Sequence, residues 1–118
     1  MNKLIPTAAL AASAMALAAS ALAADLKVGL SVSLSGPNSS LGIPYAKGMQ
    51  AALAYKGEIA GRKVQLIVLD DASDPTTAGR NARKLIEEDK VDVLMGTSGV
   101  PAAIAMAQVG KEAKVPMI

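Results

Sequence analysis

The 118-residue sequence has no histidine, cysteine, tryptophan or phenylalanine. Without histidine and cysteine the chain cannot form a Ser-His-Asp triad, a Cys-His pair, a disulfide or a zinc site built on these ligands. The two aromatic residues, Tyr45 and Tyr55, are too few for a base-stacking platform. A formal net charge of +2 is also too small to indicate nucleic acid or an anionic membrane as a partner. We therefore expect no nucleic-acid partner.

Residues 1–23 have the pattern of a secretory signal peptide. Lys3 supplies the positive start, residues 4–22 are uncharged and rich in alanine and leucine, and Ala21 and Ala23 are the small residues that signal peptidase reads. A membrane anchor is the alternative, which the high alanine content and Pro6 make weaker. We expect cleavage after Ala23 and a periplasmic mature chain that is stable without disulfides.

Strand and helix patterns alternate after this leader. The expected strands are 27–34, 64–69, 91–95 and a fourth beginning near 115, and the expected helices are 42–56, 75–88 and 101–113. Residues 64–69 are almost wholly apolar, which is typical of a strand covered on both faces. The alternation predicts an α/β fold, a parallel doubly wound sheet with right-handed crossovers. Because the chain stops inside the fourth strand, we expect it to be the N-terminal part of a longer protein.

Open parallel sheets bind ligands beyond the carboxyl ends of their strands. The loops expected there are 35–41, 70–74 and 96–100. Loop 96–100 leads into a helix N-terminus, where N–H groups and the hydroxyls of Thr97 and Ser98 suit an anion such as a carboxylate. An ordinary loop with a hydroxyl N-cap explains the same residues equally well. The composition of loop 35–41 favours a plain Gly/Pro turn.

Three acidic residues, Asp70, Asp71 and Asp74, follow the second strand. They suggest a hard metal ion, but their spacing matches no EF-hand loop. Capping of the next helix is the better interpretation, because Asp74 precedes Pro75 and suits the N-cap position. Neither the G-x-G-x-x-G fingerprint nor a P-loop is present, so we expect no cofactor and no metal.

Several short motifs occur in an order that resembles one family. They are Leu34-Ser-Gly-Pro37, Lys47-Gly-Met-Gln-Ala-Ala52, Leu69-Asp-Asp-Ala-Ser-Asp-Pro75, Leu85-Ile-Glu-Glu-Asp-Lys-Val-Asp92 and Ala113-Lys-Val-Pro-Met-Ile118. With the leader, they resemble the N-terminal lobe of the periplasmic solute-binding proteins of ABC transporters, of the branched-chain amino acid (leucine-binding) type. The resemblance implies two doubly wound lobes, with residues 24–118 in lobe 1. The two lobes close over a solute, and the protein delivers it to permease subunits in the inner membrane, without catalysis.

The resemblance also implies roles for particular positions. In leucine-type members the loop after the third strand holds the ligand carboxylate through a serine and nearby backbone N–H groups. The positions of the family's usual Ser-Ser pair fall nearer Gly99 and Val100 in this sequence. The resemblance therefore implies that the backbone N–H groups of these two residues make part of the contacts of that pair. The implied ligand-binding residues are Thr97, Ser98, Gly99 and Val100 for the carboxylate, and Ser39, Ser40 and Leu41 for the ligand side chain. The implied ligand is a branched-chain amino acid or another small carboxylate or amide.

Other functional interpretations remain open from the sequence. One is a fragment of a flavodoxin-like or Rossmann-like enzyme, against which the missing phosphate fingerprints argue. Another is a sensory ligand-binding domain with the same fold. We also expect that the 118-residue piece alone is molten or aggregates, because its fourth strand and the cover of that strand are incomplete.

Overall fold

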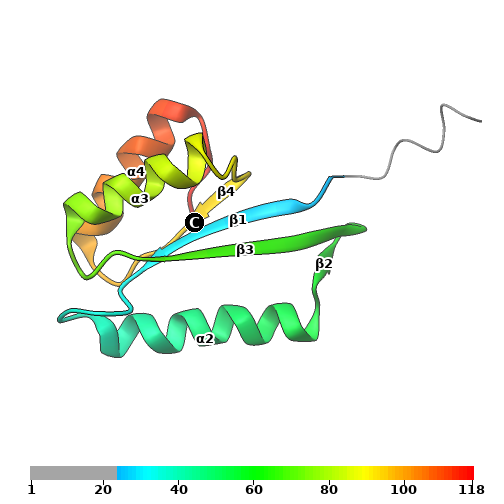
Figure 1. Cartoon of the computed structure of the whole chain (residues 1–118), viewed down its shortest axis with the longest axis horizontal. Coiled ribbons are helices and arrows are strands. Elements are labelled where there is room, and N and C mark those ends of the chain that lie inside the picture. Colours follow the sequence, from blue (N-terminus) through cyan, green and yellow to red (C-terminus); the bar gives the residue numbers. More distant parts are fainter. Residues whose placement is uncertain (1–23) are drawn as a thin grey trace, which may run out of the picture.

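The computed structural model describes residues 24–118, and the expected signal peptide lies outside them. The strands are β1 (Leu26–Val32), β2 (Glu58–Ile59), β3 (Arg62–Asp70) and β4 (Val93–Met95). The helices are α2 (Ser39–Tyr55), α3 (Pro75–Glu87) and α4 (Val100–Ala113). The three helices and the first three strands expected after the leader are therefore present, with shifts at their ends, whereas the expected fourth strand is reduced to an isolated bridge among the described residues (Figure 1).

The described strands form one sheet in the order β2-β3-β1-β4. β1 runs parallel to β3 on one side and parallel to β4 on the other. The expected fourth strand begins as a parallel bridge between Met117 and Leu94. The predicted parallel sheet is thus confirmed, with one addition. β2 pairs antiparallel with the start of β3, a short hairpin that the sequence analysis did not predict and that makes the sheet mixed.

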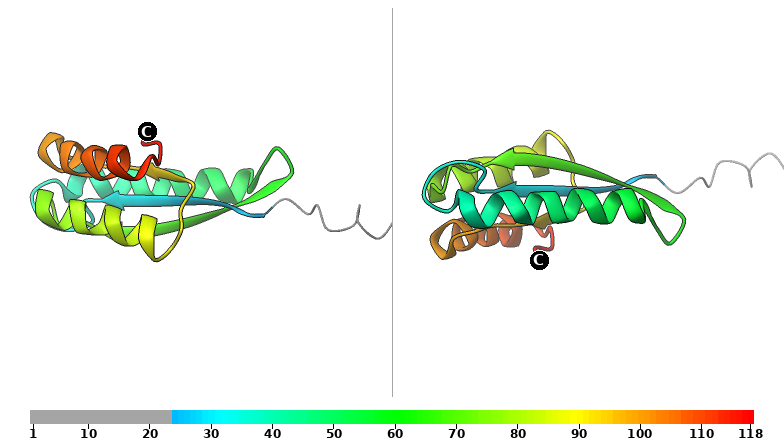
Figure 2. Two further views of the ribbon diagram at one scale, coloured as in Figure 1. Left: turned by 90° about the horizontal axis from the view of Figure 1, so that it is seen from above. Right: turned by 90° about the horizontal axis from the view of Figure 1, so that it is seen from below.

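Helices cover both faces of this sheet. α2 lies on one face, and α3 and α4 lie together on the other (Figures 1 and 2). On the α2 face the buried residues are Leu30, Val32 and Ala46, and on the α3–α4 face they include Leu85, Leu94 and Met106. Side chains of β3 pack against both clusters, which confirms that this strand is covered on both sides.

The start of α2 differs from the prediction. The helix begins at Ser39 rather than at residue 42, because the amides of Leu41 and Gly42 already donate to the Asn38 carbonyl oxygen, at 3.0 and 3.1 Å. Its buried residues are Gly42 and Ala46, whereas Ala52 is exposed. The predicted loop 35–41 is therefore shorter, and its last three residues belong to a helix.

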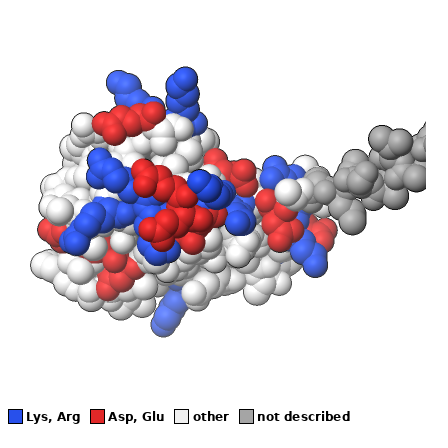
Figure 3. Space-filling model, turned by 45° about the horizontal axis from the view of Figure 1, so that its top comes forward, with Lys and Arg blue, Asp and Glu red and all other residues white. Residues whose placement is uncertain are grey.

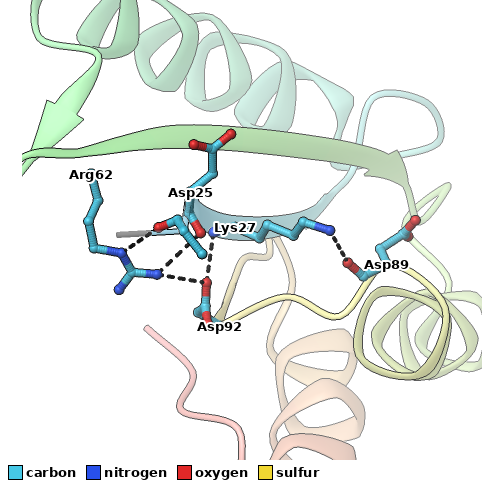
Figure 4. A network of polar contacts seen from close by, with 6 residues as sticks. Asp25, Lys27, Arg62, Asp89 and Asp92 are labelled. Carbon is cyan, nitrogen blue, oxygen red and sulfur yellow. Dashed lines mark hydrogen bonds and ion pairs between the residues drawn. The ribbon is translucent and has the colours of Figure 1, made fainter. Parts of the chain in front are cut away.

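A polar network fastens the amino ends of the strands (Figure 4). Arg62 Nε donates to the Ala24 carbonyl oxygen at 2.7 Å, and the same guanidinium lies 3.7 Å from the Asp92 carboxylate. That carboxylate also accepts from the Lys27 amide at 2.9 Å. These contacts join the starts of β1 and β3 to the residue before β4, at the end of the sheet opposite the ligand-binding loops predicted above.

The charged side chains of both signs are interleaved on the face shown in Figure 3. On α3 and just beyond it, the Lys84 ammonium lies 3.7 Å from Glu88 and 3.0 Å from Asp89. Such pairs leave no basic stripe of the kind that binds nucleic acid on that part of the surface. Among residues 24–118, no helix has the length and apolar character needed to cross a membrane.

Candidate functional site

Two neighbouring strands send their chains to opposite faces of the sheet. β1 and β4 are paired in parallel, but β1 leads to α2 on one face and β4 leads to α4 on the other (Figure 2). In open α/β sheets this divergence opens a crevice at the carboxyl ends of the strands. The segments 35–41 and 96–100, in which the sequence analysis placed the ligand residues, follow β1 and β4 at this end of the sheet.

Asp70, at the end of β3, organises the segment that follows β1. Its carboxylate accepts hydrogen bonds from the amides of Leu34, Ser35 and Ala72 at 2.9, 3.2 and 2.8 Å, and from the Ser35 hydroxyl at 2.6 Å. Slight burial raises the pKa of Asp70, but these hydrogen bonds outweigh it and hold the pKa below its usual value. Asp70 is therefore committed to the loops and not free to bind a solute.

Asp71 is fully buried and lies between all three junctions. It accepts from the Ser33 hydroxyl at 2.7 Å, from the Ser73 amide at 2.9 Å and from the Thr97 hydroxyl. Two hydroxyls and one amide suit a carboxylate, which accepts hydrogen bonds and has none to give when ionised. The carboxylate thus connects the segments after β1, β3 and β4.

The loop after β3 packs closely on the loop after β1. Ser73 Oγ donates to the Ser35 carbonyl oxygen at 3.0 Å and accepts from the Asn38 amide at 3.0 Å. Gly36 adopts a φ of +77°, and a Cβ there would lie 2.5 Å from the Ala72 carbonyl oxygen. Only glycine fits that backbone without strain. The two loops therefore form one rigid platform.

The segment 96–100 holds four of the predicted ligand residues in different environments. The Thr97 hydroxyl is used by Asp71, and Ser98 Oγ is buried without a hydrogen-bond partner among the described residues. Gly99 is the N-cap of α4, where no side chain caps the helix, and Val100 is its first residue, 73% exposed. This segment therefore offers one unpaired hydroxyl next to the uncapped start of a helix.

The segment 39–41 lies in the first turn of α2, not in a loop as predicted. Ser39 is half-buried, while Ser40 and Leu41 are exposed, Leu41 to 62%. This turn lies close to the segment 96–100. A Cβ placed on Gly42 would lie 2.9 Å from Ser98 Oγ, and one on Gly99 would lie 2.9 Å from Asn38 Nδ2. The structure thus brings the two predicted groups of ligand residues together.

The three aspartates serve the loops and the next helix. Asp74 accepts from the Thr77 amide at 2.6 Å and from the Thr77 hydroxyl at 2.8 Å, which is the predicted N-cap of α3. The Thr77 amide, with smaller help from its hydroxyl and from Arg80, lowers the pKa of Asp74. No group of three or more acidic residues in the described part of the chain is arranged to hold a metal ion.

The sequence analysis missed several residues that shape this site. Gly42, Asn38, Ser33 and Ser73 were not singled out, and Asp71 was considered only for metal binding or capping. The one available signal was the position of Asp71 directly after a buried strand, since polar residues at that point face the other strand ends. The hydroxyl groups that donate to each carboxylate come from loops that meet only in the folded structure. The spacing of residues along the chain does not show these pairs.

The helix-covered parallel strands define an α/β lobe, and residues 25–118 match the periplasmic binding protein family. The chain therefore belongs to this family, as the resemblance predicted. The Leu/Ile/Val-binding protein homolog 7 of Brucella suis is 35% identical over 111 residues, which cover 92% of this chain and 28% of the relative. The family consists of solute-binding proteins, which are not enzymes.

Solved structures show the same lobe. A leucine-binding protein from Thermotoga maritima is similar with a TM-score of 0.75 and 30% identity, over 78% of this chain and 26% of that one. A solute-binding protein of an ABC transporter from Rhodopseudomonas palustris, in complex with 3,4-dihydroxybenzoic acid, gives 0.74 and 37%, over 79% and 26%. The fold is that of the N-terminal lobe of a type 1 periplasmic binding protein, and the chain spans less than a third of these relatives' lengths.

Proposed function

We propose that this chain is the first part of lobe 1 of a solute-binding protein of an ABC transporter. In this proposal residues 1–23 direct secretion, and the mature protein works in the periplasm. It captures a small amino acid or carboxylate between two lobes and passes it to permease subunits in the inner membrane. The similarity to a leucine-binding protein and to a protein holding a benzoic acid supports this, because both ligands carry a carboxylate.

The observation that carries the proposal is the unpaired Ser98 hydroxyl. Among residues 24–118 its oxygen is buried without a hydrogen-bond partner, beside the uncapped first turn of α4 at Gly99 and Val100. A buried hydroxyl without a partner is costly, so a native site normally supplies one. A ligand carboxylate accepts hydrogen bonds from a hydroxyl and from helix N-terminal N–H groups alike. We therefore assign the carboxylate to Ser98 Oγ and to the amides of Gly99 and Val100.

We assign the Thr97 hydroxyl a different role from the one that the resemblance implied. A hydroxyl has a single proton, and Thr97 donates it to Asp71. The Thr97 side chain therefore has no proton left to donate to a ligand carboxylate. We assign Ser39, Ser40 and Leu41 to the ligand side chain, because they lie in the first turn of α2, next to Gly42, which packs against Ser98.

Binding by the purified polypeptide, as its gene encodes it, tests the proposal. After unfolding and refolding to remove bound solute, leucine and 3,4-dihydroxybenzoate are titrated by calorimetry, followed by other branched-chain amino acids and small carboxylates. We expect one of them to bind, and Ser98→Ala to weaken it about 10- to 100-fold, as loss of one charge-assisted hydrogen bond does. Thr76→Ala, at an exposed position in α3, is the control and should bind normally. The proposal fails if no compound of this panel binds.

A further inference from the structure

We propose that Asp71 is a positioning residue for the ligand-binding segment 96–100 and that it acts through the Thr97 hydroxyl. This inference rests on the function proposed above. Asp71 itself is fully buried and does not face the crevice as an exposed ligand would. Its effect on a solute is therefore indirect, through the direction in which it holds the segment after β4.

The first support is the cost of burying a carboxylate. An ionised carboxylate inside a protein is unfavourable unless hydrogen bonds replace its water. Asp71 receives these bonds from Ser33, Ser73 and Thr97, one from each of the three strand-to-helix junctions. Each donor that is lost leaves part of the charge unsatisfied, so the carboxylate favours the arrangement in which all three segments stay in place.

The second support is the position of Thr97 in the segment. The junctions after β1 and β3 are joined by many hydrogen bonds, from Asp70 and Ser73 as well as from Asp71. Among residues 24–118, the bond from Thr97 to Asp71 is the one hydrogen bond that joins segment 96–100 to either of them. Thr97 directly precedes Ser98, so fixing its side chain also fixes where the Ser98 hydroxyl and the Gly99 amide point.

Thr97→Val is the informative variant, because it keeps the shape of the side chain and removes only the hydroxyl. Thr97→Ser keeps the hydroxyl and should restore what valine removes. Thr77→Val is the matched control. Thr77 Oγ1 donates to Asp74 at 2.8 Å, so this variant removes the same group from the same kind of bond, but at the start of α3. All variants are made in the polypeptide as its gene encodes it.

The first measurement is affinity for the compound that binds the wild type, leucine or 3,4-dihydroxybenzoate. Thr97→Val should weaken binding about tenfold or more, and Thr97→Ser should bring it back to within about threefold. Thr77→Val should lower the melting temperature without changing affinity. Wild-type affinity in Thr97→Val overturns the inference. So does a loss of affinity in Thr77→Val as large as in Thr97→Val, since that shows a general effect of destabilisation.

The second measurement is hydrogen–deuterium exchange without ligand, which separates this inference from the proposed function. The amides of residues 98–103, apart from Pro101, which has no amide hydrogen, should exchange faster in Thr97→Val, while those of α2 and α3 stay as in the wild type. In Thr77→Val the change should be confined to the start of α3. If the wild type binds neither compound, the ligand assignment fails, and the exchange rates alone then test the role of Asp71. Unchanged exchange at 98–103 in Thr97→Val then overturns the role of Asp71.

Discussion

Gly42 and Gly48 lie in the same helix but in different surroundings. A Cβ on Gly42 would lie 1.9 Å from the Ser33 carbonyl oxygen, whereas a Cβ on Gly48 would meet nothing within 4 Å. Gly42 therefore lets the first turns of α2 approach the end of β1, where the candidate site lies. The sequence showed a glycine at each position but not this contact, because the contact depends on how the helix crosses the sheet.

Substitution of these two glycines by alanine should shift stability in opposite directions. Gly42→Ala should lower the free energy of unfolding by about 1–3 kcal/mol or more, since backbone atoms must move to admit the methyl group. Gly48→Ala should raise it by about 0.5–1 kcal/mol, because alanine restricts the unfolded chain and favours helix. Urea denaturation of both variants measures this. Equal stability of Gly42→Ala and the wild type would show that the close approach is absent.

The helices α2 and α3 show why some element ends are predictable. α3 was expected at 75–88 and occupies Pro75–Glu87, because its cap is local: Asp74 accepts from the Thr77 amide three residues on. The start of α2 was predicted too late in the sequence. The Asn38 side chain makes no cap, and the backbone N–H of Asn38 instead donates to Ser73 Oγ at 3.0 Å. That partner is distant in sequence, so local pattern does not reveal it.

The Asp74 cap should make stability depend on pH in the acid range. The pKa of Asp74 lies below its ordinary value of 3.8, so its carboxylate stabilises the fold at neutral pH. This contribution is lost as the pH falls below that ordinary value and through the lower pKa of the folded state. Asp74→Ala should reduce the melting temperature at pH 7. Its melting temperature should then decrease less than that of the wild type as the pH is lowered. Asp74→Asn should keep most of the cap but show the same smaller decrease, because asparagine caps without titrating. Melting curves between pH 7 and pH 2 check this, and an unchanged acid profile in both variants would contradict it.

The outer side of α4 carries an exposed apolar patch. Val100, Ile104 and Ile118 are 73%, 63% and 76% exposed, and they border a hollow of about 380 Å³ that Met117 also lines. A contiguous exposed apolar patch favours association. The sequence analysis expected the piece to be molten or to aggregate because its fourth strand and the cover of that strand are incomplete. It did not show that these side chains share one face with residues 117 and 118.

Residues 24–118 expressed alone should therefore self-associate. We expect sedimentation velocity to show species larger than a monomer, which Ile104→Lys reduces because it places a charge in the centre of the patch. Tyr55→Lys is the control, since Tyr55 is 93% exposed at the end of α2, away from this patch. A monodisperse monomer with an intact melting transition would show that the patch does not drive association.

The hydrogen bonds that Asp70 and Asp71 accept also bear on how such a lobe changes over evolution. The two carboxylates and their partners form the support of the site, while Leu41 and Ser40 on α2 project outward from it and carry none of those bonds. In the proposed site, mutations at the outward positions would alter which solute is preferred and leave the support untouched. The solute preference of such a lobe can thus change by one substitution at a time without destabilised intermediate sequences.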